Sequence, residues 1–146
     1  MSRVFEAGAP LRFAECDPAG IAFYPRLVER VNNVVEDWFA AEIGMSFADM
    51  HREGAERVGV PCRSLALEFL NPGRLGEPLT LALTVAALGR SSIALAIAAR
   101  LADGRPMFTA RPTLVWCAWG QDGPRPAPIP AVLRARMAAF LAHPAV

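Results

Sequence analysis

The sequence of 146 residues has no lysine, one tyrosine, two histidines and three cysteines. All 15 Lys-or-Arg side chains are therefore arginines, and the formal net charge is only +1. A nucleic-acid binder usually has a clear basic excess, so this near-neutral balance argues against nucleic-acid binding. The cysteines, Cys16, Cys62 and Cys117, are widely spaced and form no metal-binding pattern. We therefore expect no metal site and a reducing environment.

Long apolar runs are also absent. The longest, residues 93–99, is far too short to span a membrane, and the first residues, MSRVFEAGAPLRF, contain no run of signal-peptide length. We expect a cytoplasmic protein with no membrane partner. No flavin or nicotinamide motif and no glycine-rich phosphate loop is present, so no cofactor is expected. Hydrophobic residues make up 53% of the chain, which is typical of an ordered globular protein, and the length fits a single domain over residues 1–146.

The strongest helical pattern follows directly on the segment ECDPAGIAFYP, residues 15–25. Over residues 25–43 the apolar side chains recur at helical spacing, as Leu27, Val28, Val31, Val34, Val35, Trp38 and Phe39. Pro25 suits the first helical position, where a missing N–H costs nothing, and Gly44 suits the position just after the helix. The sequence predicts a long helix with one heavily buried face.

The rest of the chain alternates with a period of two. Strands are predicted over residues 4–14, 65–69, 79–86, 93–98 and 107–119, with turn residues between them. We expect the last four strands to run as successive hairpins and a short helix to cover residues 131–142. Pro112 cannot donate to a ladder, which predicts a bulge or kink there. The plan is α+β, an antiparallel sheet with one helix covering a face.

Small apolar residues occupy the second face of this sheet, namely Ala82, Ala86, Ala94, Ala96 and Ala98. An apolar face is more readily packed against a partner subunit than left in water. A general alanine bias of the genome explains the same composition equally well.

With this order of elements, the segment ECDPAGIAFYP and the helix behind it resemble the active-site segment of the 4-hydroxybenzoyl-CoA thioesterase family. The resemblance covers nearly the whole chain, including LALEFLNPGRLGEPLTL, the turn GRSS and the hairpin DGRP. It implies the hotdog fold, in which an antiparallel sheet wraps around one long central helix. It also implies a homodimer or homotetramer that joins sheets and builds its sites at the subunit interface.

The activity implied by the resemblance is hydrolysis of an acyl-CoA, with coenzyme A as part of the substrate. The motif favours an aromatic acyl group, although enzymes for other acyl groups share it. Asp17 corresponds to the family's catalytic carboxylate, acting as nucleophile or general base. The oxyanion donor is assigned to the backbone N–H of Tyr24, at the helix start, where N–H groups are unpaired. The expected substrate-binding residues around them are Pro18, Gly20, Ile21 and Phe23.

Several of these residues have a structural alternative. Asp17 before a proline is also a common helix cap. Glu15 is interpreted as a surface or loop-orienting acid, and Cys16 as a small buried side chain without a histidine partner. His51 is expected to be an ordinary exposed histidine. The rings of Phe23, Tyr24 and Trp38 either line an aromatic pocket or belong to the core.

By the same resemblance, the turn that contains Arg90, Ser91 and Ser92 holds the nucleotide of coenzyme A. Arg90 is the first choice for a phosphate, because guanidinium groups bind phosphate oxygens in pairs. It stands there as a single arginine, whereas the relative it most resembles is richer in basic residues at this turn. Arg63 and Arg111 are weaker candidates.

The hotdog fold also supports other functions. A hotdog hydratase or dehydratase generally pairs an acid with a histidine, and residues 1–50 contain no histidine. A hydrolase of acyl groups on a carrier protein and a non-catalytic acyl-CoA-binding subunit remain as alternatives.

Overall fold

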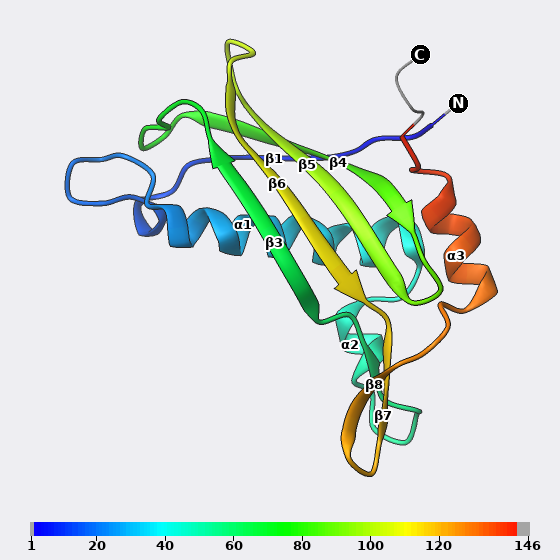
Figure 1. Ribbon diagram of the computed structural model, residues 1–146. Coiled ribbons are helices and arrows are strands. Elements are labelled where there is room, and N and C mark those ends of the chain that lie inside the picture. Colours follow the sequence, from blue (N-terminus) through cyan, green and yellow to red (C-terminus); the bar gives the residue numbers. More distant parts are fainter. Residues whose placement is uncertain (1, 143–146) are drawn as a thin grey trace.

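A five-stranded antiparallel sheet wraps around one long helix in the computed structural model, which describes residues 2–142 (Figure 1). The strand order is β1-β4-β5-β6-β3. The bounds of these strands are β1 Phe5–Pro10, β3 Cys62–Phe69, β4 Pro78–Leu88, β5 Ser92–Leu101 and β6 Pro106–Val115. The predicted α+β plan is confirmed.

The central helix α1 spans Tyr24–Trp38, and Pro25 lies in its first turn as predicted. Its apolar stripe faces the sheet, and Trp38 is completely buried. The helical run continues over Phe39–Ile43 as a wider π-helix and ends at Gly44, whose φ of 82° is readily adopted only by glycine. The predicted length of the helical run is therefore correct, but its last turn is not α-helical.

The prediction that the last four strands run as successive hairpins is wrong at the first connection. Only β4, β5 and β6 follow one another as neighbours, whereas β3 pairs with β6 at the far edge of the sheet. The link between β3 and β4 makes other contacts instead: the Ala22 N–H donates to Gly73 O at 2.8 Å, and the Leu75 N–H donates to Gly20 O at 2.9 Å. The link therefore packs against the segment that precedes α1 and cannot form a tight turn.

Pro112 is buried within β6 and causes no change of register. The β5–β6 pairs on either side of it, Ala94–Thr113 and Ile97–Ala110, keep the same register, with the pairing interrupted between them. The irregularity near this position lies in β3 instead, between Cys62 and Ser64. Of the bulge or kink predicted at Pro112, the bulge is therefore wrong. The pairing with β5 is interrupted at this residue, which accommodates its missing N–H.

The remaining elements are short. A 3₁₀ turn covers Phe13–Glu15, α2 covers Phe47–Met50, α3 covers Ala131–Ala138, and a second sheet has the order β2-β7-β8. The strands of that sheet are β2 Val58–Gly59, β7 Cys117–Gly120 and β8 Gly123–Pro126. Residues 107–119 thus belong to two strands, and the predicted first strand and last helix are shorter than expected. Over residues 2–142, no helix is long and apolar enough to cross a membrane.

The two faces of the large sheet differ. The inner face packs on α1 in one continuous core, whereas no helix of the described chain covers the outer face (Figure 1). On that outer face Ala82, Ala94, Ala96 and Ala98 are half-buried and Ala86 is exposed. The packing of this face against a partner subunit stays a prediction.

Candidate active site

The segment before α1 folds into a tight loop that presents Asp17. Cys16 and Ala22 form an isolated antiparallel bridge, and the Asp17 N–H donates to Ile21 O at 2.8 Å. Gly20 makes the reversal with a φ of 77°, a conformation that a side chain disfavours. The sequence DPAG therefore gives a stiff loop, as its proline and glycine indicated.

One oxygen of the Asp17 carboxylate holds this loop. Its Oδ1 accepts the N–H of Ala19 at 2.9 Å and that of Ile21 at 3.2 Å. Within residues 2–142 no donor reaches Oδ2. Asp17 does not cap α1, because the cap position of that helix is Phe23. The carboxylate thus has one oxygen fixed by its own turn and one oxygen available.

Asp17 lines an open pocket of about 510 Å³ between the start of α1 and the end of β3. The rings of Phe23, Tyr24 and Phe69 also line it, and the Tyr24 and Phe69 ring centroids are 6.1 Å apart. Leu27 contributes a further apolar side chain. The pocket is therefore mainly aromatic and apolar, with Asp17 as its one charged lining residue.

Trp38 is absent from this lining, because its side chain lies in the core against Phe39 and Phe140. Of the three aromatic candidates, two line the pocket and Trp38 belongs to the core.

The backbone N–H of Tyr24 is the first of α1. Among the described residues it donates no hydrogen bond, whereas the N–H of Phe23 donates to Glu15 O at 2.8 Å and that of Arg26 to Phe23 O at 3.0 Å. Pro25 has no N–H. The first turn of a helix leaves such donors unpaired, and the helix dipole makes them favourable for negative charge.

The interpretation of Glu15 as a loop-orienting acid agrees with its hydrogen bonds, whereas Cys16 is half-buried rather than buried. Burial alone would raise the pKa of Glu15, but hydrogen bonds from Arg30 and the Arg12 N–H, together with the arginine charges, hold it below its ordinary value. Partial burial, and then the charges of Glu15 and Asp17, raise the pKa of the Cys16 thiol. Because the thiolate is the nucleophilic form, Cys16 is poorly suited to attack a thioester.

The turn with Arg90, Ser91 and Ser92 lies far from Asp17 in the same chain. It connects β4 to β5 beside α3, at the opposite end of the sheet from the loop before α1 (Figure 1). The first residue of β4, Pro78, pairs with Pro10, close to that loop. Ten residues of strand separate Pro78 from the turn, which is about 30 Å at ~3.3 Å per residue. One chain therefore does not bring the predicted catalytic residues and the predicted nucleotide-binding turn together.

The backbone around this turn is well anchored. Arg134 Nη1 donates to Gly89 O at 2.7 Å, and the Ile129 N–H donates to Arg90 O at 3.0 Å. The side chain of Arg90 stays exposed. Arg63 and Arg111 are also exposed, on β3 and β6 respectively, and neither lines the Asp17 pocket.

Sequence reasoning missed the part of the site that comes from the β3–β4 link. Leu70, Asn71 and Gly73 line the pocket opposite Tyr24, and Asn71 Nδ2 donates to Pro106 O at 2.7 Å. The dipeptide Asn-Pro followed by glycine signals a turn in the sequence, but only the fold places that turn against the loop of Asp17.

Comparison with known proteins assigns the family. The model of the thioesterase-like superfamily matches residues 11–137, and the chain belongs to this superfamily. No curated protein matches the chain.

Three solved structures illustrate the similarity of the fold. The Dynemicin thioesterase, studied with a bound polyene, has a TM-score of 0.85 at 15% identity, covering 97% of this chain and 100% of the other. A 1,4-dihydroxy-2-naphthoyl-CoA thioesterase from Synechocystis, Slr0204, has a TM-score of 0.82 at 18% identity, with coverages of 93% and 96%. A mutant 4-hydroxybenzoyl-CoA thioesterase complexed with 4-hydroxybenzoyl-CoA gives 0.82 at 18%, with coverages of 93% and 99%.

At these identities the likeness to solved structures shows the fold, which is the hotdog fold. Family and fold together define the class: a thioester hydrolase built as a hotdog domain.

Proposed function

We propose that the protein hydrolyses the thioester of an acyl-CoA to a free carboxylic acid and coenzyme A. One observation carries this proposal: Asp17, which has one available carboxylate oxygen, and Tyr24, whose N–H is unpaired, line the same apolar pocket. A thioester hydrolase needs these two elements, a base or nucleophile and an oxyanion donor, around an apolar acyl site.

The proposed steps use only this pair of groups and water. The acyl carbonyl oxygen accepts the Tyr24 N–H, which polarises the carbon and stabilises the negative charge that develops on the oxygen. Asp17 either attacks that carbon directly or removes a proton from an attacking water. After attack by water, the C–S bond breaks and gives the free acid directly. After attack by Asp17, it breaks to leave an anhydride between the acyl group and Asp17, which water then hydrolyses to the free acid and the carboxylate. On either route the sulfur leaves as thiolate and takes the proton that the water gives up, so one water is consumed per thioester.

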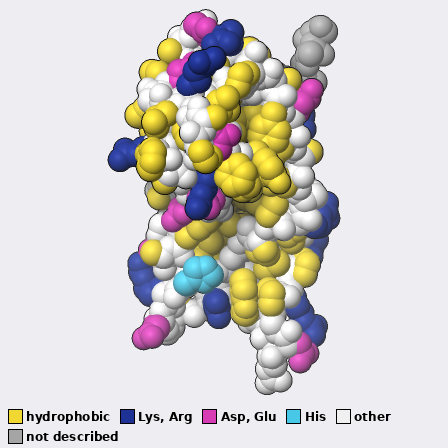
Figure 2. Space-filling model, turned by 90° about the vertical axis from the view of Figure 1, so that its left-hand side faces the viewer, with side chains coloured by type: hydrophobic (Ala, Val, Ile, Leu, Met, Phe, Trp, Pro, Cys, Tyr) yellow, Lys and Arg dark blue, Asp and Glu magenta, His cyan; other side chains and the backbone are white. Residues whose placement is uncertain are grey.

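The substrate-binding part of the proposal requires a second copy of the chain. Strand β3 is an edge strand and carries exposed apolar side chains, Leu65 and Phe69, with Leu70 just beyond it. Yellow hydrophobic side chains gather on the side of the molecule where α1 begins (Figure 2). The other edge strand, β1, is less available, because Arg30 occupies two of its carbonyl oxygens. We therefore expect a homodimer joined through β3.

The register of the sheet supports a site shared between the two copies of such a dimer. Cys62 of β3 lies level with Leu114, Leu114 with Ile93, and Ile93 with Leu88, beside the turn of Arg90. In an antiparallel β3–β3 pair, the Cys62 end of the second copy lies beside the Phe69 end of the first. The second copy's Arg90 turn would then lie at the end of the sheet where the first copy's Asp17 pocket opens.

The acyl group is proposed to be aromatic. The pocket has three aromatic rings, which favour a flat apolar acyl group by stacking or edge contacts. Two of the similar structures are thioesterases named for naphthoyl and benzoyl thioesters. The phosphates of coenzyme A would bind the exposed Arg90 of the second copy, and no further cofactor enters the proposed steps.

The test is release of free thiol from a panel of short, long and aromatic acyl-CoAs by the native protein, Asp17→Asn and Asp122→Asn. The first substitution keeps size and hydrogen bonding but removes the charge. The second makes the same change at an exposed acid in the β7–β8 hairpin. We expect Asp17→Asn to lose about a hundredfold or more in kcat, and Asp122→Asn to keep native activity.

Other outcomes have definite meanings. Equal activity of the native protein and Asp17→Asn would exclude the proposed role of Asp17. Activity on acylated carrier protein but not on acyl-CoAs would replace the substrate class with the carrier alternative. Binding of acyl-CoAs without thiol release would favour the non-catalytic subunit.

A further inference from the structure

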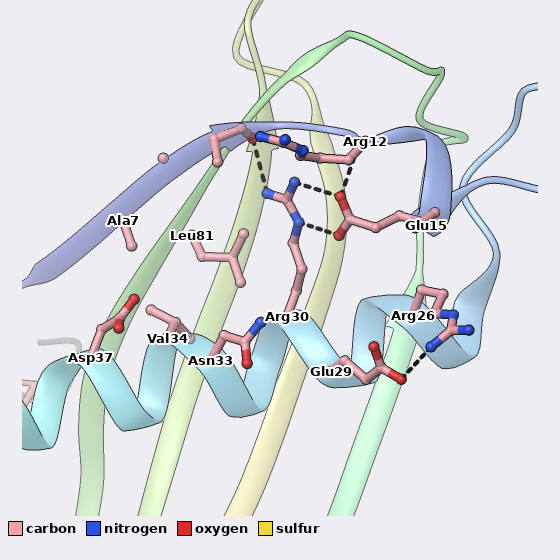
Figure 3. Close-up of a pocket in the computed structure, with 13 residues that line it drawn as sticks. Ala7, Arg12, Glu15, Arg26, Glu29, Arg30, Asn33, Val34, Asp37 and Leu81 are labelled. Carbon is pink, nitrogen blue, oxygen red and sulfur yellow. Dashed lines mark hydrogen bonds and ion pairs between the residues drawn. The ribbon is translucent and has the colours of Figure 1, made fainter. Parts of the chain in front are cut away.

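Among the described residues, Arg30 is the charged side chain that donates the most hydrogen bonds, and it contacts the base of the loop that carries Asp17. Arg30, in the second turn of α1, donates through Nε to Glu15 Oε2 at 2.5 Å and through Nη2 to Glu15 Oε1 at 2.8 Å. Nη1 donates to Ala9 O at 2.9 Å, and Nη2 also contacts Pro10 O. Figure 3 shows Arg30 rising from the helix between Glu15 and β1.

This ion pair differs from the others on the surface. The side chains of Arg30 and Glu15 are only 12% and 15% exposed, whereas those of Arg26 and Glu29, one turn earlier on the same helix, are 50% and 62% exposed. Exposed ion pairs contribute little to the free energy of folding. An arginine–carboxylate pair that makes two parallel hydrogen bonds and is largely shielded from water fixes the relative position of its two side chains. The pair therefore restrains Glu15 strongly, while Arg26 and Glu29 provide a matched comparison.

The restraint on Glu15 reaches Asp17 through the backbone. Glu15 O accepts the N–H of Phe23 at 2.8 Å, and the next residue, Cys16, is bridged to Ala22. The loop of Asp17 is thus closed between Glu15 and Phe23, and Phe23 is the cap residue directly before Tyr24. Arg30 holds the base of the loop that carries the carboxylate, from the same helix that carries the proposed oxyanion donor.

Arg30 does not reach the substrate pocket itself. It lines a separate groove of about 470 Å³ between β1 and α1, which shares no lining residue with the pocket of Asp17 (Figure 3). Any effect of Arg30 on hydrolysis therefore passes through Glu15 and the loop.

We propose that Arg30 and Glu15 form a positioning pair that sets the Asp17 carboxylate relative to the Tyr24 N–H. This inference rests on the proposed function, because it assigns the pair a role in that reaction. Misplacing a reacting group by about 1 Å can cost about a hundredfold in rate. Loss of the pair should lower kcat and leave KM for the acyl-CoA nearly unchanged.

The experiment compares Arg30→Gln, Arg30→Lys and Glu15→Gln with the control Arg26→Gln, each alone and in an Asp17→Asn background. We expect Arg30→Gln and Glu15→Gln to lower kcat about 10- to 100-fold, and Arg26→Gln to leave it unchanged. Arg30→Lys should recover only part of the rate, because an ammonium group cannot make the paired contact. In the Asp17→Asn background, Arg30→Gln should cause no further loss.

The combined variants separate positioning from folding. A pair that only stabilises the fold would lower the unfolding temperature and leave kcat unchanged well below that temperature. Alternatively, if its loss only reduces the amount of folded enzyme, Arg30→Gln would lower the native rate and the residual rate of Asp17→Asn by the same factor. Either result overturns the proposal. If Arg30→Gln does not fold, Arg30→Lys and Glu15→Gln decide by the same comparison. If Asp17→Asn alone loses nothing, the proposed function fails first, irrespective of the pair.

Discussion

Mixed dimers can test whether two subunits share one active site. Asp17 and the turn of Arg90 are about 30 Å apart along the sheet of one chain, by the ~3.3 Å rise of a strand residue, and pairing through β3 would place them at a common site. The experiment mixes Asp17→Asn chains with Arg90→Ala chains. Each variant should be nearly inactive alone at low substrate concentration.

The expected recovery follows from counting sites. In a mixed dimer, one site combines both defects, and the other combines the intact Asp17 of one chain with the intact Arg90 of the other. Random exchange makes about half of the dimers mixed, and half of their sites are native, so about a quarter of native activity should return. The assay is thiol release at substrate concentrations well below the native KM, after the chains are exchanged by reversible unfolding.

No recovery above the average of the two parents would refute the shared site. If Asp17 and Arg90 served one site from the same chain, every site in a mixed dimer would contain one defect. As a control, Asp17→Asn chains are mixed with native chains, which must give activity in proportion to the native chains and so shows that unfolding and refolding cause no loss of activity.

Three further predictions concern stability. Gly73→Ala would place a Cβ 2.6 Å from Leu11 Cδ1 and 2.6 Å from Met107 Cε, and we expect urea unfolding to show a loss of about 1–3 kcal/mol. Trp38→Ala, at a side chain with no exposure, should cost roughly 3–5 kcal/mol by the same method, and a loss under about 1 kcal/mol would contradict the core assignment. The pKa of Glu15 is lowered on folding, so its contribution to stability is present above its ordinary value of 4.5 and is lost as pH falls below it. Native protein should therefore lose more unfolding free energy between pH 7 and acid pH than Glu15→Gln does, and equal losses would argue against this ion pair.

Local patterns in the sequence predicted the elements that depend on neighbouring residues. The apolar stripe of α1, the stop at Gly44 and the tight turn of DPAG all arise from interactions within a few residues, which spacing and residue type reveal. The same reasoning located β4, β5 and β6, because short turns join them.

Which distant segments come into contact depends on the tertiary fold and could not be predicted from local patterns. The link after β3 resembles a hairpin connection in sequence, but it pairs with the loop of Asp17, and β3 goes to the opposite edge of the sheet. Glu15 and Arg30 are 15 positions apart and carry no periodic signal, yet the wrapping of β1 over α1 brings them into contact. Local sterics and alternating polarity were enough to predict the helix, most of the strands and the tight turn of DPAG. The surroundings of the loop depend on which surfaces the wrapped sheet buries together, and no local pattern contains that information.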